Sequence, residues 1–324
     1  MTARKRPIGL NHRQIKTKSF FLWFIKGLIS SPRKSDCMEK LSVYIFTLFL
    51  TATSLAQPTD KIGQLISAEN YFAATAKEKG TKQAFLFVSD ENTIVYRPGP
   101  VLAQEFYKKT KEDRGLLSWE PVFAKISKSG DWGFTTGPYT YKSNDISTNI
   151  AYGQYLSVWK KNDKDIWKLV LDLGIPHKKP LLSPKLVFNN PLNERFMHQY
   201  SDIRLKQREE LVLSTDQLYS TVLNADFNIA SDEFIAENSR LLFPGNEPII
   251  GKNSIKLFWE KQNVRFNSKP LRANRSFSGE LAYTSGDATI EQNGVKKLYH
   301  YVRIWEVQNE FKWNILIEVY TEVE

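Results

Sequence analysis

The sequence predicts an α+β fold that is present twice in tandem, with helices first in each copy and an antiparallel sheet after them. One observation behind this prediction is a repeated hairpin pattern: Trp159 and Trp167 stand eight residues apart, and so do Trp305 and Trp313. Another is the order of the segments, because a helix-like stretch precedes several aromatic and β-branched runs in both halves of the chain.

Segments of the two halves match in the same order at a nearly constant spacing. Placing Trp159 on Trp305 gives an offset of 146 residues. Two longer blocks follow the pattern, the second after a three-residue change of offset: 91–99 (ENTIVYRPG) on 237–245 (ENSRLLFPG), and 129–137 (SGDWGFTTG) on 278–286 (SGELAYTSG). Collinear matches over this length indicate that a whole domain has been duplicated.

Each copy is expected to open with helices. Residues 61–80 (KIGQLISAENYFAATAKEKG) carry apolar side chains near helical spacing and end on Gly80, a common helix stop. A Pro-Gly turn then precedes a second short helix over 101–112. The corresponding helices of the second copy are expected over 214–230 and 253–263.

The remainder of the first copy predicts a meander of strands. Four runs rich in aromatic and β-branched residues are separated by turn residues: 117–130, 131–143, 149–162 and 165–175. Trp159 ends the third run and Trp167 begins the fourth. The repeated pattern therefore predicts a cross-strand aromatic pair in each copy.

Two segments of the first copy carry a resemblance to a known family. Residues 130–141 (GDWGFTTGPYTY) and 152–177 (YGQYLSVWKKNDKDIWKLVLDLGIPH) resemble bacterial domains of the nuclear transport factor 2-like superfamily, which includes ketosteroid-isomerase-like and SnoaL-like groups. The second copy resembles it more faintly and lacks the proline after Gly286. The resemblance implies two cone-shaped domains, each a curved antiparallel sheet with N-terminal helices on its concave face. The family holds isomerases, cyclases, hydrolases and simple binding proteins, so the fold does not decide the activity.

The domain limits follow from the repeat. We expect a first domain over 61–177, a proline-containing linker over 178–210, and a second, more divergent domain over 211–324. The family commonly forms homodimers, and the two domains are expected to pack together as their counterpart within one chain.

The N-terminal 56 residues predict a targeting segment. In 38–56, Lys40 precedes an apolar run and a small-residue end at Ala56, which is the layout of a cleaved signal peptide. The apolar run is short for a membrane span. We therefore expect a mature chain from Gln57, without a stable membrane span, exported to the periplasm or beyond the cell. Residues 1–37 are a leader or a mis-assigned upstream extension, the alternative being an amphipathic membrane anchor.

Composition excludes several classes of function. The net charge is +10, but nine basic residues and one acid lie in 1–37, so the remainder is nearly balanced and a nucleic-acid partner is not expected. The only cysteine, Cys37, also lies there, which leaves the domains without thiolate chemistry. The histidines lack metal-ligand spacing, and phosphate-binding or dinucleotide-binding glycine motifs are missing from the sequence. No metal and no cofactor are expected.

Aromatic side chains of the first domain are the candidate ligand-binding residues, since a ring offers a large apolar area and, in Tyr and Trp, a polar handle. Five of them are expected to line the cone: Tyr71, Trp132, Tyr139, Tyr152 and Tyr155. An ordinary core position is the alternative for each. The second domain has Leu281 and Ala288 in place of two of these aromatics, so any pocket is expected in the first domain.

Two residues are candidates for acid–base chemistry, because enzymes of the superfamily place an Asp or a His inside the cone. Strict alternation in 167–173 (WKLVLDL) puts Asp172 on the face opposite Leu169 and Leu171, away from the cone. His177 either reaches the mouth of the pocket or begins the linker. A catalytic role is therefore left open for both.

Together these features predict an exported protein that binds a small, largely apolar ligand or serves as a structural module. The alternative is a ketosteroid-isomerase-like or SnoaL-like cyclase-type enzyme acting in the first domain. Binding is favoured over catalysis, since no catalytic constellation can be read from the sequence.

Overall fold

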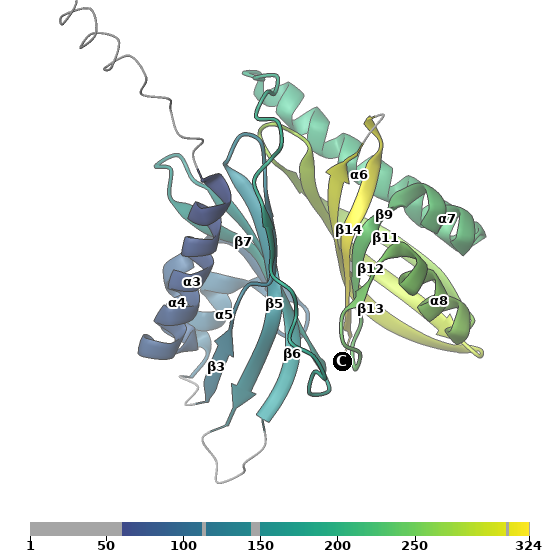
Figure 1. Cartoon of the computed structure of the whole chain (residues 1–324), viewed down its shortest axis with the longest axis horizontal. Helices are drawn as coiled ribbons and strands as arrows, with labels where there is room; N and C mark the ends of the chain where they lie inside the picture. Colours follow the sequence, from purple (N-terminus) through teal and green to yellow (C-terminus); the bar gives the residue numbers. More distant parts are fainter. Residues whose placement is uncertain (1–59, 112–114, 144–149, 309–310, 324) are drawn as a thin grey trace, which may run out of the picture. The chain divides into compact units, whose positions relative to one another are not determined.

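Two sheets, each preceded in sequence by helices, make up the described part of the chain (Figure 1). The computed structural model describes residues 60–111, 115–143, 150–308 and 311–323, which belong to one compact unit. The predictions of a leader over 1–37 and a signal peptide over 38–56 concern residues outside those ranges. Within the ranges, no helix combines the length and the apolar character that a membrane crossing requires.

The first half of this unit (61–189) opens with three helices: α3 (Lys61–Lys79), α4 (Thr81–Val88) and α5 (Ala103–Lys109). Asp60 caps α3, because its side chain accepts a hydrogen bond from the backbone N–H of Gly63. Gly80 separates α3 from α4 with a φ of 88°, a backbone conformation that favours glycine. The chain can therefore turn sharply between two helices that both cover the sheet.

The sheet of the first half has eight strands: β1 (Ser89–Tyr96), β2 (Pro100–Leu102), β3 (Leu116–Trp119), β4 (Phe123–Ile126), β5 (Trp132–Lys142), β6 (Ile150–Lys161), β7 (Trp167–His177) and β8 (Val187–Asn189). Their order is β2-β1-β7-β6-β5-β4-β8, with β3 also paired to β5. Most pairs are antiparallel, but β1 runs parallel to β7 and β4 parallel to β8. The expectation of a purely antiparallel sheet is corrected on this point, because β1 enters from a helix rather than from a hairpin.

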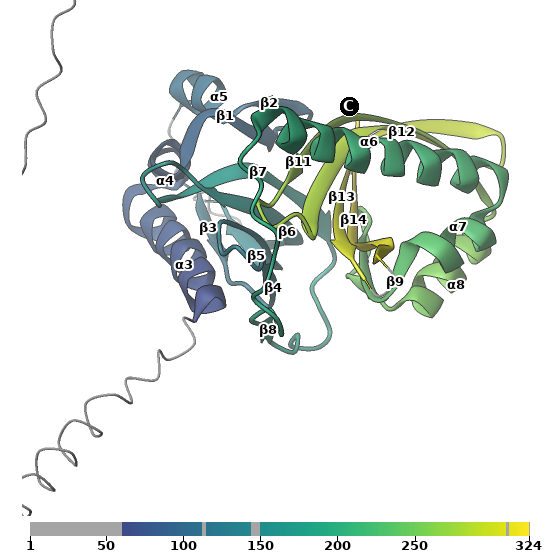
Figure 2. The same ribbon diagram turned by 90° about the horizontal axis from the view of Figure 1, so that it is seen from above.

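The second half (202–322) repeats the arrangement. Its helices are α6 (Asp202–Ala225), α7 (Phe227–Phe234) and α8 (Lys252–Gln262), and its strands are β9 (Ile235–Leu242), β10 (Ile249–Ile250), β11 (Val264–Arg275), β12 (Leu281–Gln292), β13 (Val295–Val307) and β14 (Trp313–Glu322). The strand order is β10-β9-β14-β13-β12-β11. Seen from above, α3 to α5 lie against the first sheet and α6 runs along the second (Figure 2). The predicted α+β class, with N-terminal helices on each sheet, is confirmed.

The strand registers show the duplication residue by residue. Ile94 pairs with Leu171 in the first sheet, and Arg240 with Ile317 in the second, at the predicted offset of 146. The register shift within the β6–β7 pair recurs at the equivalent place in the β13–β14 pair. The tandem duplication is therefore confirmed by backbone geometry as well as by sequence.

That register shift decides which face each residue of β7 occupies. Trp159 pairs with Leu169 and Val158 with Leu171, so Val170 is an extra, unpaired residue, a β-bulge. Leu169 packs with Trp159 beneath the helices, whereas Leu171 packs on the opposite face of the sheet. Strict alternation along β7 was therefore a wrong expectation.

The two tryptophans of each hairpin are not directly opposed, although both belong to the same apolar cluster in each half. In the first half, Trp167 stands opposite Lys161. In the second half, Trp313 stands opposite Val307 and Trp305 opposite Ile315. The bulge and the longer turn shift the second tryptophan of each hairpin along the strand.

The segment expected as a linker, 178–210, contains regular structure. Strand β8 pairs with β4, and the side-chain oxygen of Asn190 accepts a hydrogen bond from the backbone N–H of Ile62 at 2.9 Å. Helix α6 begins at Asp202, inside the same segment. The connection is thus partly built into the first half and partly into the helices of the second.

The two sheets share one apolar core on the faces turned away from their helices. Buried residues of both halves contribute to it: Phe123, Trp132, Phe134, Leu156, Val158 and Leu171 from the first, and Leu281, Tyr283, Val302, Ile304, Leu316 and Val319 from the second. Polar links accompany the apolar contact, among them an ion pair between Lys125 and Glu306. The halves are therefore packed on each other as two sheets of a sandwich.

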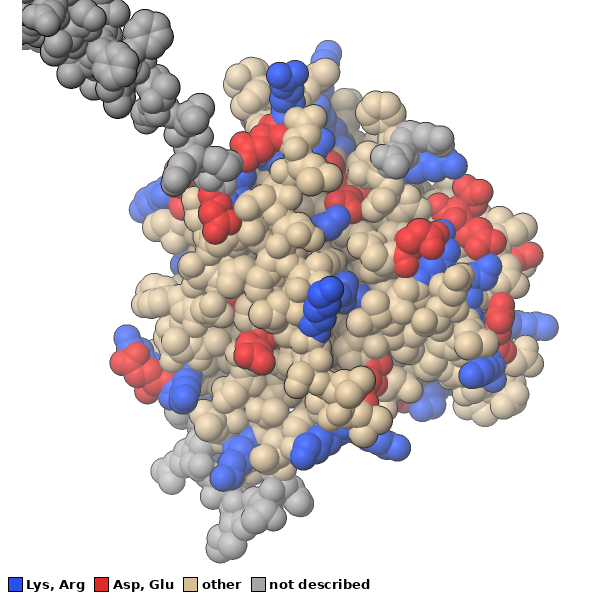
Figure 3. All heavy atoms as spheres, in the orientation of Figure 1, with Lys and Arg blue, Asp and Glu red and all other residues tan. Residues whose placement is uncertain are grey.

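Charge on the molecular surface is mixed. On the face drawn in Figure 3, basic and acidic side chains are interspersed over wide uncharged areas. This matches the near balance of charge outside residues 1–37.

Candidate functional site

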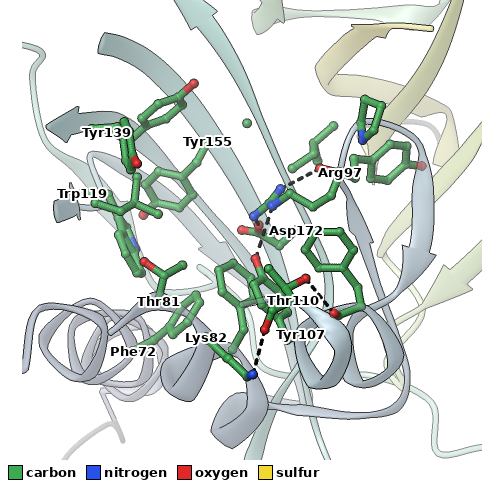
Figure 4. Close-up of a pocket in the computed structure, with 18 of the residues that line it drawn as sticks. Phe72, Thr81, Lys82, Arg97, Tyr107, Thr110, Trp119, Tyr139, Tyr155 and Asp172 are labelled. Carbon is green, nitrogen blue, oxygen red and sulfur yellow. Dashed lines mark hydrogen bonds and ion pairs between the residues drawn. The ribbon is translucent and has the colours of Figure 1, made fainter. Parts of the chain in front are cut away.

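A cavity of about 640 Å³ lies between the sheet and the helices of the first half (Figure 4). This volume is within the range of roughly 300–1,000 Å³ that is usual for small-molecule sites. The space on the helix-covered side of each sheet is called the cone below. The residues that line it in the first half come from α3, α4, α5 and the strands β1, β3, β5, β6 and β7, together with the turns beside them.

The cavity has one aromatic wall and one polar wall. Trp119, Tyr139 and Tyr155 lie on one side, and Arg97 and Asp172 lie opposite (Figure 4). Further apolar side chains of the helices close the space: Phe72, Phe85 and Phe106. Such a mixture of broad apolar surface and few polar groups is typical of a site for a mainly apolar molecule.

Tyr139 reaches the cavity because two glycines make room for its ring. A Cβ atom on Gly153 would lie 2.2 Å from the Tyr139 ring, and one on Gly174 would lie 3.1 Å from it. The ring therefore rests on bare backbone of β6 and β7. A side chain at Gly153 would displace Tyr139 and change the shape of the cavity.

Arg97 and Asp172 form an ion pair on the polar wall, with 2.9 Å between Arg97 Nη2 and Asp172 Oδ1. Ser157 Oγ donates to the other carboxylate oxygen at 3.1 Å. Arg97 also donates from Nε to the Tyr107 hydroxyl and from Nη1 to the Tyr96 carbonyl. Burial raises the pKa of Asp172, while Arg97 and Ser157 favour its ionised form. Asp172 therefore holds the guanidinium in place.

Asp172 faces the cone and not the opposite side, which corrects the expectation from alternation. The extra residue Val170 shifts the pattern by one position. Asp172 consequently shares its face with Leu169 and pairs with Ser157 across the ladder, whereas Leu171 belongs to the core between the sheets.

Tyr155 presents a hydroxyl that lacks a hydrogen-bond partner among the described residues. The residue is only 5% exposed and lines the cavity. Burial raises the pKa of Tyr155 well above its ordinary value, so the hydroxyl stays protonated. The ring of Tyr155 therefore contributes apolar surface to the cavity, while its hydroxyl is buried away from the open space.

Glu69 lies behind the aromatic wall and was missed by the sequence analysis. Its carboxylate is fully buried and accepts hydrogen bonds from Trp119 Nε1 at 2.6 Å, from Trp159 Nε1 at 2.7 Å and from the Thr135 hydroxyl. Burial raises the pKa of Glu69 to about 7, against the opposing effect of these donors. The sequence contained a sign of its burial, because this acid stands four residues after Leu65 and therefore lies on the apolar face of the helix.

Four of the seven candidates from the sequence do not line the cavity. Trp132 and Tyr152 stand at odd separations from Tyr139 and Tyr155 along their strands, which places them on the opposite face. Trp132 is buried between the two sheets, and its indole N–H donates to Asn274 at 2.9 Å.

The other two lie away from the cavity for different reasons. Tyr71 is 54% exposed on α3, beside the ring of Phe87. His177 is buried at the end of β7, where its Nδ1 lies 2.6 Å from the Lys178 carbonyl oxygen. The structure thus brings together Tyr139, Tyr155 and Asp172 from the predicted set, and adds Arg97, Tyr107 and Trp119.

The cone of the second half is filled at the equivalent positions. Phe243 stands where the first half has Arg97, and Tyr299 and Tyr320 stand where it has Gly153 and Gly174. The ring centroids of Phe243 and Tyr299 are 5.5 Å apart. The same backbone that leaves a cavity in the first half therefore holds an aromatic cluster in the second.

A buried charge network completes the filled cone. Arg303 donates to Glu318 Oε1 at 2.8 Å and also pairs with Asp216, and all three side chains are buried. Tyr301, the counterpart of Tyr155, donates to Asp216 at 3.0 Å. The hydroxyl that is unpaired in the first half is thus satisfied internally in the second.

The second half has a smaller hollow on its surface. It measures about 350 Å³ and lies over β11 to β13, with Lys269, Asp287 and His300 among its lining residues. Across the part of the chain that the structure describes, no cluster of His, Cys, Asp or Glu has the makings of a metal site.

Comparison with known proteins gives structural matches only. No protein-family model matches the chain, and no curated protein matches it either. Solved structures similar to part of it include a nuclear transport factor 2-like protein from Cytophaga hutchinsonii, at 11% identity and a TM-score of 0.31, covering 35% of this chain and 97% of that one.

Two more solved structures are similar to part of the chain. A ketosteroid isomerase-like protein from Erwinia carotovora atroseptica matches at 12% identity and a TM-score of 0.30, over 39% of this chain and 99% of that chain. A nuclear transport factor 2-like superfamily protein from Salmonella enterica matches at 10% identity and a TM-score of 0.32, over 37% of this chain and 93% of that chain.

Proposed function

We propose that the chain binds a small, largely apolar molecule in the cone of its first half. The observation that carries the proposal is the contrast between the two cones. The first has Gly174 and Arg97 in the lining of a cavity of about 640 Å³, and the second has Tyr320 and Phe243 at those positions. A site that is open in one copy and filled in the other, with aromatic rings and the Arg97 guanidinium in its lining, is suited to a ligand.

The alternative of a ketosteroid-isomerase-like or cyclase-type enzyme has less support. A general base needs a carboxylate or imidazole free to take a proton from the substrate. Both oxygens of Asp172 accept hydrogen bonds from protein groups, and Glu69 accepts three behind the wall of the cavity. His177 lies outside the lining. These arrangements favour binding over proton transfer.

Export is part of the proposal and depends on the sequence of 38–56. The charged start, apolar run and small-residue end of that segment support a cleaved signal peptide. Mass spectrometry of the protein recovered from culture fractions tests it. A first residue at Gln57 is the expected result, and an intact 1–37 on the exported protein contradicts it.

The binding proposal is tested by filling the cone. The variant Gly174→Tyr introduces the residue that the second half carries at Tyr320, and its side chain would occupy the space beside Tyr139. Titration with the neutral fluorescent probe N-phenyl-1-naphthylamine should show binding to the parent protein and a loss of at least about tenfold in affinity for the variant.

Lys164→Tyr is the matched control, because it adds the same ring to the exposed β6–β7 turn. It should bind the probe like the parent. Circular dichroism and the unfolding temperature of each variant establish that the fold is kept. Probe binding that is unchanged in Gly174→Tyr contradicts the proposal.

A further inference from the structure

We infer that the ligand is an amphipathic acid, an apolar molecule with one carboxylate, and that the carboxylate binds against Arg97. This inference rests on the proposed function and adds the chemical class of the molecule. It follows from the charge and the hydrogen-bonding capacity of the groups that face the cavity.

Cations outnumber anions in the lining of the cavity. Arg97, Lys82 and Lys111 line it, and Asp172 is the one acid among the described lining residues. The carboxylate of Asp172 is already paired with Arg97. The excess of positive charge in a space with low-dielectric aromatic walls favours an anionic ligand over a neutral or cationic one.

At the polar wall, the groups that still lack a hydrogen-bond partner are donors. Arg97 uses three of the five N–H groups of a guanidinium, on Asp172, Tyr107 and the Tyr96 carbonyl. Both oxygens of Asp172 are already acceptors. The two remaining N–H groups of Arg97 have no partner in the described residues, so the wall offers donors to a ligand oxygen.

The fixed position of Arg97 also favours a carboxylate ligand. Its contacts with Asp172, Tyr107 and Tyr96 fix the guanidinium before any ligand arrives. A guanidinium held in one orientation loses little entropy on binding and matches the planar geometry of a carboxylate. The exposed fraction of the Arg97 side chain, 28%, leaves part of it accessible from the cavity.

The open donors of Arg97 discriminate among head groups. A ligand oxygen can accept from them, whereas a protonated amine or a plain hydrocarbon cannot and leaves the donors of the polar wall unmatched.

The remaining lining suits the apolar part of the molecule. Rings of Phe72, Phe85, Phe106 and Trp119 border the cavity. Contact with these side chains removes the hydrocarbon surface of the ligand from water and supplies affinity that does not depend on its head group. A head group at Arg97 and a tail among the rings therefore use both walls.

The test compares three molecules with the same tail and different head groups: dodecanoate, dodecanol and dodecylamine. Each molecule is titrated at pH 8 into protein that carries bound N-phenyl-1-naphthylamine, at concentrations below those at which the molecule aggregates, and displacement of the probe is measured. We expect dodecanoate to displace the probe at a concentration at least about tenfold lower than dodecanol, as a charge-assisted hydrogen bond implies, and dodecylamine to be the weakest. A polycyclic carboxylic acid and its methyl ester, run alongside, report whether the tail is a chain or a ring system.

The double variant Arg97→Gln with Asp172→Asn removes both charges of the pair at once, so no buried charge is left alone. We expect the preference for dodecanoate over dodecanol to be lost in this variant. Lys168→Gln is the matched control, because it removes a positive charge from β7 outside the cavity lining. It should keep the preference of the parent.

The outcomes separate this inference from the proposed function. Equal displacement by dodecanoate and dodecanol, or stronger displacement by the amine, overturns the inference and leaves apolar binding intact. A preference for dodecanoate that survives in the double variant also overturns it. Probe binding that is absent in the parent, or unaffected by Gly174→Tyr, instead removes the proposed function itself.

Discussion

The hydroxyl oxygens of Ser129 and Ser278 lie 2.7 Å apart, and each residue donates its backbone N–H to the hydroxyl of the other at 3.1 Å. The two serines are equivalents in the duplicated blocks 129–137 and 278–286. A residue that contacts its own counterpart in a reciprocal way marks a local two-fold relation, as at the interface of a symmetric dimer. The halves of this chain therefore meet as two subunits would.

Trp132→Ala is expected to destabilise the protein and to leave ligand affinity unchanged. The side chain is fully buried in the core that the two sheets share, and truncating such a residue costs about 3–5 kcal/mol. Urea unfolding measures the loss, and probe titration under native conditions measures binding. A weaker affinity for the probe in a variant that remains folded would contradict the placement of Trp132 outside the cavity.

Glu69 is expected to make stability fall as the pH rises from about 4.5 to about 7. Its pKa in the folded protein is about 7, above the ordinary value of 4.5, so the folded state keeps a proton that the unfolded chain has lost within this window. The effect is about 3 kcal/mol at 1.36 kcal/mol per pKa unit. The contribution of protonated Glu69 to the free energy of unfolding is complete below pH 4.5 and lost above pH 7.

The measurement is urea unfolding at several pH values for the parent and for Glu69→Gln. The variant should show a shallower decline between pH 5 and 7. Burial also raises the pKa of Asp172, which contributes a slope of the same sign in both proteins. Parallel pH profiles for the two proteins are incompatible with a raised pKa at Glu69.

Arg303→Met is expected to destabilise the protein far more than a surface substitution. Arg303 is fully buried and is paired with Asp216 and Glu318, so its removal leaves two buried carboxylates without a cation. Breaking such a network costs about 3–5 kcal/mol. Unfolding by urea measures it, with Lys296→Met on the exposed part of the same strand as the control. A loss no larger than that of the control rules out a structural role for the network.

Arg97 and Asp172 are expected to be energetically coupled, though more weakly than the network of the second half. The Arg97 side chain is 28% exposed, so screening reduces the pair to about 1–2 kcal/mol. A double-mutant cycle with Arg97→Gln and Asp172→Asn gives the coupling free energy from four unfolding curves. Additive effects of the two single variants would show that the contact contributes nothing to folding.

Local patterns in the sequence were sufficient for the α+β class and for most of the helices and long strands, but not for the parallel pairs β1–β7 and β4–β8. Apolar spacing over 61–80 predicts α3, aromatic runs between turns predict β5 to β7, and the matched blocks predict the second half. These signals depend on neighbours along the chain. The duplication could be identified for the same reason.

The site was harder to predict because its residues depend on pairing between strands. Asp172 faces the cone only because Val170 forms a bulge against β6, and alternation within β7 alone points it the other way. The role of Glu69 depends on indoles that arrive from β3 and β6. The position of Trp132 was predictable in part, since its seven-residue separation from Tyr139 already implies opposite faces.

The glycine-to-tyrosine differences between the cones show what covalent linkage makes available. In a dimer of identical chains, a glycine that opens one binding site opens its symmetry mate as well, and both halves lose the packing. Joined in a single polypeptide, the copies are free to differ: Gly174 leaves a void on one side, while Tyr320 helps to complete a solid core on the other. One copy can thus keep an open cone while its twin acts as the rigid support against which it is held.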